Sequence, residues 1–379
     1  MTKQRGHGEG SISQRLDGRW RAEISLEGGG RKTYYGKTRR EVADKLKEAL
    51  RDQQQGTLVT GANQTVATFL ERWLADSVKP SVRPRTHEGY CQQVRVHIIP
   101  ALGKLHLTKL TAQHLQTHYQ AQLAAGLSSS SVRQQHAILH RALEQAARWR
   151  LVARNVADLV DAPQPARKEM QPLDTGQVRR FLIAAAEDRF YALYCLAVTT
   201  GMRQSELLGL AWVDVDLDRA SLAVRQQLVR VQGEGFRLAE PKTGKGRRAI
   251  TLPPFVVDAL RQHRKRQLEE RLALGPEWEE QGLVFPNELG KPAERSNLVQ
   301  RSFQPILEKA GLPRIRFHDL RHTAATLLLS EGTHPKIVQE RLGHSTIAIT
   351  LDVYSHVLPS MQIETASKLE GLLGRSSAV

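Results

Sequence analysis

Two polar interruptions place the strongest limit on how this chain of 379 residues can fold. The first runs from Gln53 to Gln64, and the second contains Pro163-Gln-Pro-Ala-Arg-Lys-Glu169. Stretches rich in proline and polar residues are typical of linkers between domains. We therefore expect three units that each bury a core of their own, at 1–56, 65–162 and 173–379, joined by linkers at 57–64 and 163–172.

The first unit reads as a small α+β domain. Turn residues at Asp17-Gly18 and Gly28–Gly30 separate three strand-like segments, Ile12–Leu16, Arg19–Leu26 and Arg31–Tyr35. Thr38 and Glu41 have the spacing of a capping box, and a helix with an apolar face follows. A sheet with basic and aromatic residues can enter a DNA groove, although solvated strand faces are the alternative. These residues are Arg19, Arg21, Arg31, Lys32 and Tyr34.

The second unit reads as a helical bundle. Apolar residues recur at helical spacing, as in Phe69, Leu70, Trp73 and Leu74. Four such stretches in about 100 residues predict a compact bundle, with Trp73 and Trp149 in its core. Basic positions between the helices are candidate phosphate contacts. They are Arg83, Arg85, Arg95, Lys104, Lys109 and Arg133.

The third unit reads as mostly helical with a small antiparallel sheet. Asp174 and Gln177 cap a first helix, and an apolar helix at Tyr191–Thr199 ends at Gly201. Strands are expected within Ala220–Val231, Phe236–Ala239 and Arg248–Leu252, with Pro241–Gly246 as the tip of a hairpin between the last two. Leu283–Phe285 also looks like a strand. The whole chain is therefore expected to be multidomain and mainly α.

The charge of the chain favours a polyanionic partner. The formal net charge is +16, and residues 1–56, 57–170 and 171–379 contribute +5, +7 and +4. A protein that is basic along its whole length suits nucleic acid. No apolar run approaches the ~20 residues of a membrane span, and no secretory signal is evident, so we expect a cytoplasmic protein. Cys91 and Cys195 are expected to be reduced thiols.

Four stretches of the third unit carry groups suited to phosphate chemistry. Arg203 follows Gly201 and precedes a helix start, and Glu206 is placed to hold its side chain. The alternative interpretation is that Arg203 and Glu206 form an ordinary surface salt bridge. Lys242 lies at the Thr-Gly-Lys-Gly turn, where it can donate a proton, with Lys245 as a rival and a solvated lysine as the alternative. His318 and Arg321 fall on one face of a helix start.

The fourth stretch contains a histidine and, ten residues later, a tyrosine. Gly343 resembles a helix C-cap that places His344 at a turn, and Tyr354 lies on the next helix. The alternative interpretations are that His344 only caps the helix and that Tyr354 is an ordinary exposed tyrosine. The combined set holds no carboxylate cluster for a metal and no phosphate-binding loop, so it indicates cationic stabilisation of a phosphorane and attack by a side-chain oxygen.

These stretches, in this order, resemble the tyrosine recombinase (phage integrase) family, over roughly 173–360. The resemblance implies a 3′-phosphotyrosyl intermediate on Tyr354, oxygen contacts from Arg203 and Arg321, general-acid catalysis by Lys242, proton transfer by His318 and a phosphate contact from His344. Glu206 would be a supporting residue. Gly246 stands where members often carry a small hydroxyl residue. The N-terminal units resemble arm-binding and core-binding domains.

The family resemblance also implies partners. We expect double-stranded DNA, a homotetramer on paired DNA sites, and accessory proteins that bend DNA or set directionality, with no cofactor and no metal. An apolar stripe after Tyr354, including Leu369 and Leu373, suits docking on a neighbour or on its own domain. The expected function is integration and excision of a mobile element or prophage. The alternatives are a resolvase for chromosome dimers and a non-catalytic helix-turn-helix regulator, suggested by Pro335–Ile349.

Overall fold

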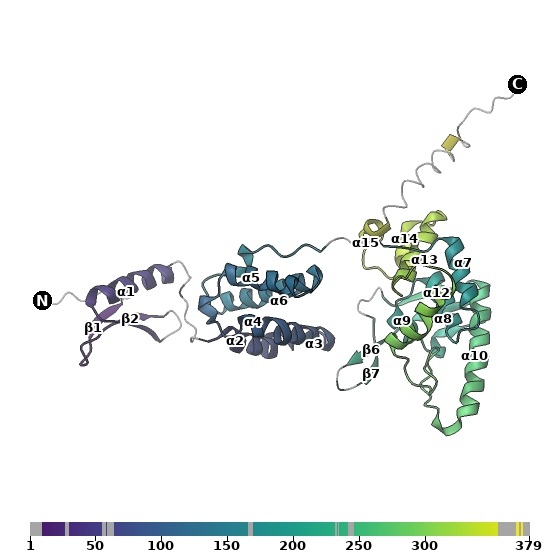
Figure 1. Ribbon diagram of the computed structural model, residues 1–379, viewed down its shortest axis with the longest axis horizontal. Helices are drawn as coiled ribbons and strands as arrows, with labels where there is room; N and C mark the ends of the chain where they lie inside the picture. Colours follow the sequence, from purple (N-terminus) through teal and green to yellow (C-terminus); the bar gives the residue numbers. More distant parts are fainter. Residues whose placement is uncertain are drawn as a thin grey trace. The chain divides into compact units, whose positions relative to one another are not determined.

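The computed structural model describes residues 10–26, 30–54, 58, 64–165, 170–231, 233, 235–241, 246–354, 369, 370 and 373, without the side chains of 349 and 352–354. The chain divides into two compact units, Met1–Arg167 and Lys168–Val379, and each is described by itself (Figure 1). The hydrophobic residues form separate clusters in 22–58 and 66–160 and a large one in 173–320, with a small one at 325–342.

The N-terminal sheet and helix are confirmed. Strands β1 (Ser11–Gln14), β2 (Trp20–Ser25) and β3 (Arg31–Gly36) form an antiparallel sheet in the order β1-β2-β3. Helix α1 (Arg39–Gln54) packs Val42, Leu46 and Ala49 on the sheet. Leu58, a residue of the expected linker, is buried in the same cluster.

Strand register assigns the basic residues of this sheet to two different faces. Lys32 pairs with Ile24 and Tyr34 with Ala22, on the face that α1 covers. Arg21 pairs with Tyr35, and Arg31 with Ser25, on the opposite face. Lys32 and Tyr34 are therefore not part of an open basic face, contrary to the expectation from sequence. Tyr35 is the aromatic residue on that face, and it is 49% exposed.

The middle segment is the expected helical bundle. Its regular and irregular helical pieces are α2 (Val66–Trp73), η1 (Leu74–Val78), α3 (Pro84–Gln92), η2 (Gln93–Ile98), α4 (Ile99–Leu102), η3 (Leu107–Lys109), α5 (Ala112–Ala124), α6 (Ser129–Arg148) and η4 (Val156–Leu159). Phe69, Leu70, Trp73 and Leu74 are all buried. Trp149 differs from the prediction because it is 37% exposed, packing edge-on against Phe69.

Some of the expected phosphate contacts in this bundle are engaged within the protein. Arg95 donates to both carboxylate oxygens of Glu71, at 2.9 and 2.8 Å. Arg85 donates to Glu88 at 3.1 Å, and Arg133 donates to Gln164 at 2.8 Å. A DNA phosphate would have to compete with the carboxylate at Arg95 and Arg85.

The C-terminal unit is built around a buried helix. Its helical elements are α7 (Thr175–Ala184), α8 (Tyr191–Thr200), α9 (Gln204–Leu208), η5 (Trp212–Asp214), α10 (Pro254–Leu274), η7 (Gly275–Glu277), α11 (Arg295–Leu298), η8 (Val299–Phe303), α12 (Gln304–Lys309), α13 (Asp319–Ser330), α14 (Pro335–Leu342) and α15 (Ile347–Tyr354). Helix α8 is apolar on all sides and contacts both α10 and α13 (Figure 1). A helix that is hydrophobic all round belongs in a core.

The strands of this unit pair differently from the prediction. Strands β4 (Val215–Asp216), β5 (Ser221–Val224) and β8 (Arg248–Thr251) form one antiparallel sheet, and β6 (Gln227–Val231) pairs with β7 (Gly235–Ala239) in another. Because β8 pairs with β5 rather than β7, the segment Pro241–Gly246 connects two sheets and is not a hairpin tip. Leu283–Phe285 is buried but forms only an isolated bridge, Ala211–Leu283. In the part of the chain that is described, no helix is long and apolar enough to cross a membrane.

Candidate active site

Arg203 is positioned by the end of α8. Gly201 has a φ of 63°, the left-handed conformation that ends a helix and that glycine adopts without strain. Arg203 then occupies the N-cap of α9, and its side chain is 39% exposed. Its Nη1 donates to Oε1 of Glu206 at 2.7 Å, and its backbone N–H donates to Oε2 at 3.0 Å. The predicted restraint by Glu206 is therefore present in the fold.

Arg321 is tied to the same helix end. It lies in the first turn of α13, is 3% exposed, and donates from Nη1 to the carbonyl oxygen of Gly201 at 2.7 Å. The arginine at 321 is thus bonded to the backbone two residues before Arg203. Helix α13 also packs against α8, the helix that ends at Thr200, just before the segment that carries Arg203.

The two histidines lie at helix boundaries. His318 is the N-cap residue of α13, and its ring stands edge-on to that of His322 at 5.1 Å. His344 follows Gly343, the left-handed C-cap of α14 with a φ of 68°. Its Nδ1 lies 2.9 Å from Oγ1 of the buried Thr350, so a phosphate contact from His344 would use Nε2.

Burial lowers the pKa values of both histidines, and the charges of Arg321 and Arg203 contribute to each shift. Burial, followed by the charges of Arg321 and Arg203, lowers the pKa of His344 to about 3. The pKa of His318 is lowered by desolvation and then by His322 and Arg321, but the residue is exposed, so desolvation acts more weakly on it than on His344. Both imidazoles are therefore neutral at pH 7, and an anionic phosphate between them and the arginines would favour protonation.

Two of the predicted residues fall outside what can be described in detail. Lys242, with its rival Lys245, lies outside the described residues. Tyr354 is the last residue of α15, and its side chain also lies outside the described parts. Helix α15 contacts α14, the helix that ends beside His344. The structure therefore brings together Arg203, His318, Arg321 and His344 and places the backbone of Tyr354 on an adjoining helix.

Sequence reasoning missed one charged residue of this region, Arg248. Its side chain is 6% exposed and lies 2.9 Å from Oε2 of Glu206. The signal was present, because residues two apart on a strand share a face and Arg248 therefore shares a face with the buried Ile250. A charge on an apolar strand face indicates a buried ion pair.

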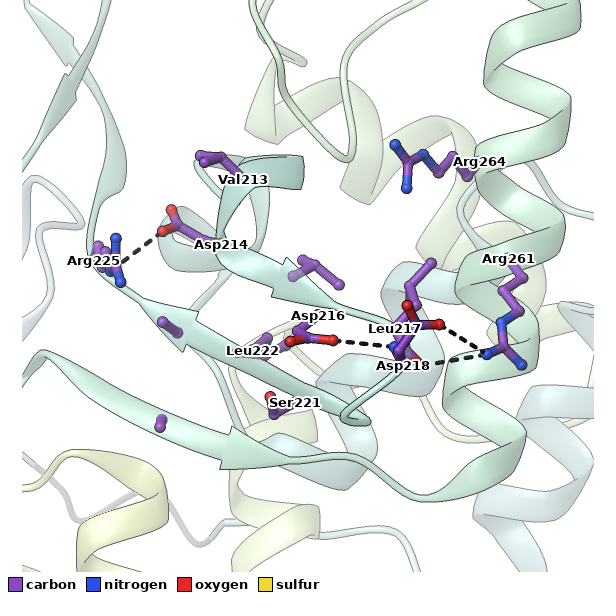
Figure 2. A pocket seen from close by; sticks show the side chains of 13 residues that line it. Val213, Asp214, Asp216, Leu217, Asp218, Ser221, Leu222, Arg225, Arg261 and Arg264 are labelled. Atoms are coloured by element: carbon purple, nitrogen blue, oxygen red, sulfur yellow. Dashed lines mark hydrogen bonds and ion pairs between the residues drawn. The ribbon is translucent and has the colours of Figure 1, made fainter.

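A separate hollow of about 540 Å³ lies between the β4–β5 strands and α10 (Figure 2). It is lined by both charges, including Asp214 paired with Arg225 at 3.4 Å and Asp218 near Arg261 at 3.9 Å. None of the candidate catalytic residues lines it. Within the described residues, no group of three or more His, Cys, Asp or Glu side chains is arranged to hold a metal ion.

Comparison with known proteins identifies the family. Residues 171–361 match the phage integrase family, and residues 65–124 match the N-terminal SAM-like domain of phage integrases. An integrase of Streptomyces ambofaciens is 33% identical, covering 100% of both chains. A XerC-like tyrosine recombinase of Caldanaerobacter subterraneus subsp. tengcongensis is 31% identical, covering 90% of this chain and 92% of that protein.

Two solved structures share the fold. The Tn1549 transposon integrase, in complex with transposon right end DNA, has a TM-score of 0.68 at 24% identity, covering 82% of this chain and 100% of that chain. A lambda integrase tetramer bound to a Holliday junction has a TM-score of 0.55 at 16% identity, covering 92% and 96%. The fold and the matches define a site-specific DNA recombinase. This chain belongs to the phage integrase family of tyrosine recombinases.

Proposed function

We propose that Tyr354 is the nucleophile of this recombinase and that Arg203, Arg321, His318, His344 and Lys242 assist it. The observation that carries the proposal is the bond from Arg321 to the Gly201 carbonyl, which holds two guanidinium groups at one helix end. Guanidinium groups bind the non-bridging oxygens of a phosphate through paired N–H donors. Both arginines also depress the pKa of His344, as expected for groups that surround one phosphate.

The proposed reaction begins with attack of the Tyr354 oxygen on a backbone phosphorus. A 3′-phosphotyrosyl bond forms as the bond to the 5′-oxygen breaks; Lys242 donates a proton to that oxygen, and His318 accepts the phenol proton. Tyrosine has an ordinary pKa near 10, so its attack at neutral pH requires nearby cations or a base. The 5′-hydroxyl of another strand reverses the step. The covalent bond conserves the energy of the phosphodiester, so no nucleotide is consumed.

We infer that the recombination integrates and excises a mobile element. The Streptomyces ambofaciens relative is an integrase and matches this chain from end to end. The N-terminal sheet and helix of this chain add a basic unit suited to arm-type DNA sites, whereas a chromosome-dimer resolvase requires only a core-binding and a catalytic domain. A circular junction of the element is the expected excision product, and an unchanged chromosome after induction of the gene would contradict it.

The assembly and domain boundaries are further parts of the proposal. Exchange between two duplexes cuts four strands, so four protomers are expected on a pair of sites. The domains are taken as 1–56, 65–162 and 173–379, with Leu58 packing on the first. Accessory proteins that bend DNA or set directionality, and action in the cytoplasm where the DNA substrate lies, complete the proposal.

The direct test traps the covalent intermediate. A duplex from the element junction, nicked beside the cleavage position, loses its 5′-hydroxyl fragment by diffusion and accumulates a protein–DNA adduct that denaturing electrophoresis detects. The wild-type protein is expected to form the adduct and Tyr354→Phe to form none. Tyr90→Phe is the matched control, because it keeps the ring stacked on Trp73 and should retain the adduct. An adduct with Tyr354→Phe would refute the assignment.

A further inference from the structure

The side chain of Arg248 joins three segments of the catalytic unit. From the start of β8 it donates through Nη2 to Oε2 of Glu206 at 2.9 Å, through Nε to the carbonyl oxygen of Arg341 at 2.6 Å and through Nη1 to the carbonyl oxygen of Gly246 at 3.0 Å. A guanidinium group that is only 6% exposed is costly to bury unless its N–H groups are paired. These bonds account for its burial.

The first partner connects Arg248 to the phosphate-binding arginine. Oε2 of Glu206 accepts from Arg248 and from the backbone N–H of Arg203, while Oε1 accepts from the Arg203 side chain. Burial alone would raise the pKa of Glu206, but the charges and hydrogen bonds of Arg248 and Arg203 lower it below its usual value. Arg248 therefore keeps Glu206 ionised, and the ionised carboxylate sets the direction of Arg203.

The second partner connects Arg248 to His344. The carbonyl of Arg341 belongs to the last turn of α14, three residues before His344. The Arg341 side chain extends the link, because it donates to the carbonyl oxygens of Thr199 in α8 and Thr251 in β8, each at 3.2 Å. The end of α14 is thus bonded to the strand that carries Arg248 and to the helix that ends before Arg203.

We propose that Arg248 is a positioning residue for strand cleavage: through Glu206 and the end of α14, it holds Arg203 and His344 at one spacing. This inference rests on the proposed function, since it concerns the same phosphate. Arg248 itself does not reach the DNA, because its side chain is buried and its donors are bonded to protein oxygens. A displacement of about 1 Å in such groups can lower a rate on the order of 100-fold.

The test measures the chemical step separately from DNA binding. Saturating protein is mixed with the nicked junction substrate, and adduct formation is followed in a single turnover, with Kd and thermal unfolding measured in parallel. Arg248→Met is expected to slow adduct formation by about 10- to 100-fold while Kd changes less than about threefold. Arg248→Lys is expected to recover part of the rate, since one ammonium group can bond Glu206 but cannot span all three partners.

The matched control is Arg189→Met. Arg189 is also largely buried; it pairs with Glu270 at 2.8 Å and donates to the carbonyl oxygens of Pro286 and Asn287, none of which belongs to the candidate site. Arg189→Met is expected to lower the unfolding temperature but to leave the cleavage rate of the folded protein unchanged. A loss of rate as large as that of Arg248→Met would show that any buried arginine has this effect, and would overturn the inference.

A double-mutant comparison tests the route through Glu206. In a Glu206→Gln background, Arg248→Met is expected to slow cleavage by a smaller factor than in the wild-type background, because the bond to Glu206 is already weakened and only the bonds to the carbonyl oxygens of Arg341 and Gly246 remain to be lost. A full, independent loss in that background would contradict the inference, as would a loss confined to Kd. If the wild-type protein forms no adduct, the proposed function fails instead; if wild type and Arg248→Met cleave equally, only this inference fails.

Discussion

Single buried histidines show how strongly this fold perturbs its titratable groups. His263 is 4% exposed, and its Nε2 lies 2.6 Å from the carbonyl oxygen of Val284. Burial lowers its pKa to about 4, and the nearby Arg266 and Arg189 act in the same direction. His344 is shifted in the same sense, to about 3, near the candidate phosphate site. In both cases the folded chain disfavours the protonated form.

These shifts predict how stability changes with pH. Between pH 6.5 and pH 4 the unfolded chain binds protons at these histidines and the folded chain does not, so the free energy of unfolding falls as the pH falls. His263 alone should lower it by about 2 kcal/mol between pH 7 and pH 5. Urea unfolding of the full chain at both pH values measures the difference. His263→Gln should reduce the slope, and an unchanged slope would contradict the pKa of His263.

At the scale of elements, the helix ends of the catalytic unit could be predicted from sequence and its strand pairing could not. Gly201 and Gly343 mark C-caps because glycine adopts the left-handed conformation of these positions without strain. The Asp174–Gln177 capping box was predictable because its hydrogen bonds join residues three apart. The pairing of β8 with β5 is non-local, so adjacent strands with a glycine-containing turn wrongly suggested a hairpin. The burial of Arg248 could have been inferred from its strand face, but its partners could not, because two of them are distant along the chain and two of the three bonds are to backbone carbonyl oxygens.

The C-cap of α8 gives a prediction at this scale. A Cβ at Gly201 would lie 2.4 Å from Cδ2 of Leu342 in α14 and would force a side chain into the left-handed region. Gly201→Ala should therefore displace the helix end that holds Arg203 and Arg321. Expected results are a loss of about 1 kcal/mol or more in stability and at least a tenfold slower single-turnover cleavage.

The control for this substitution is Gly332→Ala. Gly332 also has a positive φ, of 74°, but a Cβ there meets nothing within 4 Å. It should lower the unfolding temperature through backbone strain alone and leave the cleavage rate of the folded protein near that of wild type. Equal cleavage rates for the two variants would show that the α8 cap has no part in the chemistry.

At the scale of the whole molecule, separate hydrophobic clusters allow the proposed DNA-binding segments and the proposed catalytic unit to be tested one at a time. The clusters of 22–58, 66–160 and 173–320 share no residue. Each of the three segments has its own apolar periodicity and its own cluster, while the chain divides into two compact units, so the division into three domains stays a prediction. The sequence could not predict which residues of the N-terminal sheet are exposed, because this depends on which face α1 covers. On the face opposite α1, Arg21 and Arg31 form ion pairs with Glu23 at 3.4 and 3.6 Å, so a DNA phosphate would have to compete with that carboxylate.

Removal of residues 1–63 tests this division. The deletion takes Leu58 with its cluster and leaves Thr65, the N-cap of α2, in place. Binding to arm-type DNA should be lost, and binding to the core site should change little at low salt. Where weak binding to arm-type DNA remains, the dependence of log Kd on log salt should be shallower, since fewer phosphates are neutralised. Equal loss at both kinds of site would contradict an arm-binding role.

The path of the chain from β7 to β8 has a consequence for how such proteins diversify. Pro241 and Gly246 bound a segment whose two ends continue into different sheets, β6–β7 and β4–β5–β8. Inserting or deleting residues between them would leave the hydrogen-bond register of both sheets unchanged, and the entropic cost of a longer loop grows slowly with length. The segment that carries Lys242, the proposed general acid, can therefore differ in length between relatives or engineered variants without changing the strand pairing of either sheet.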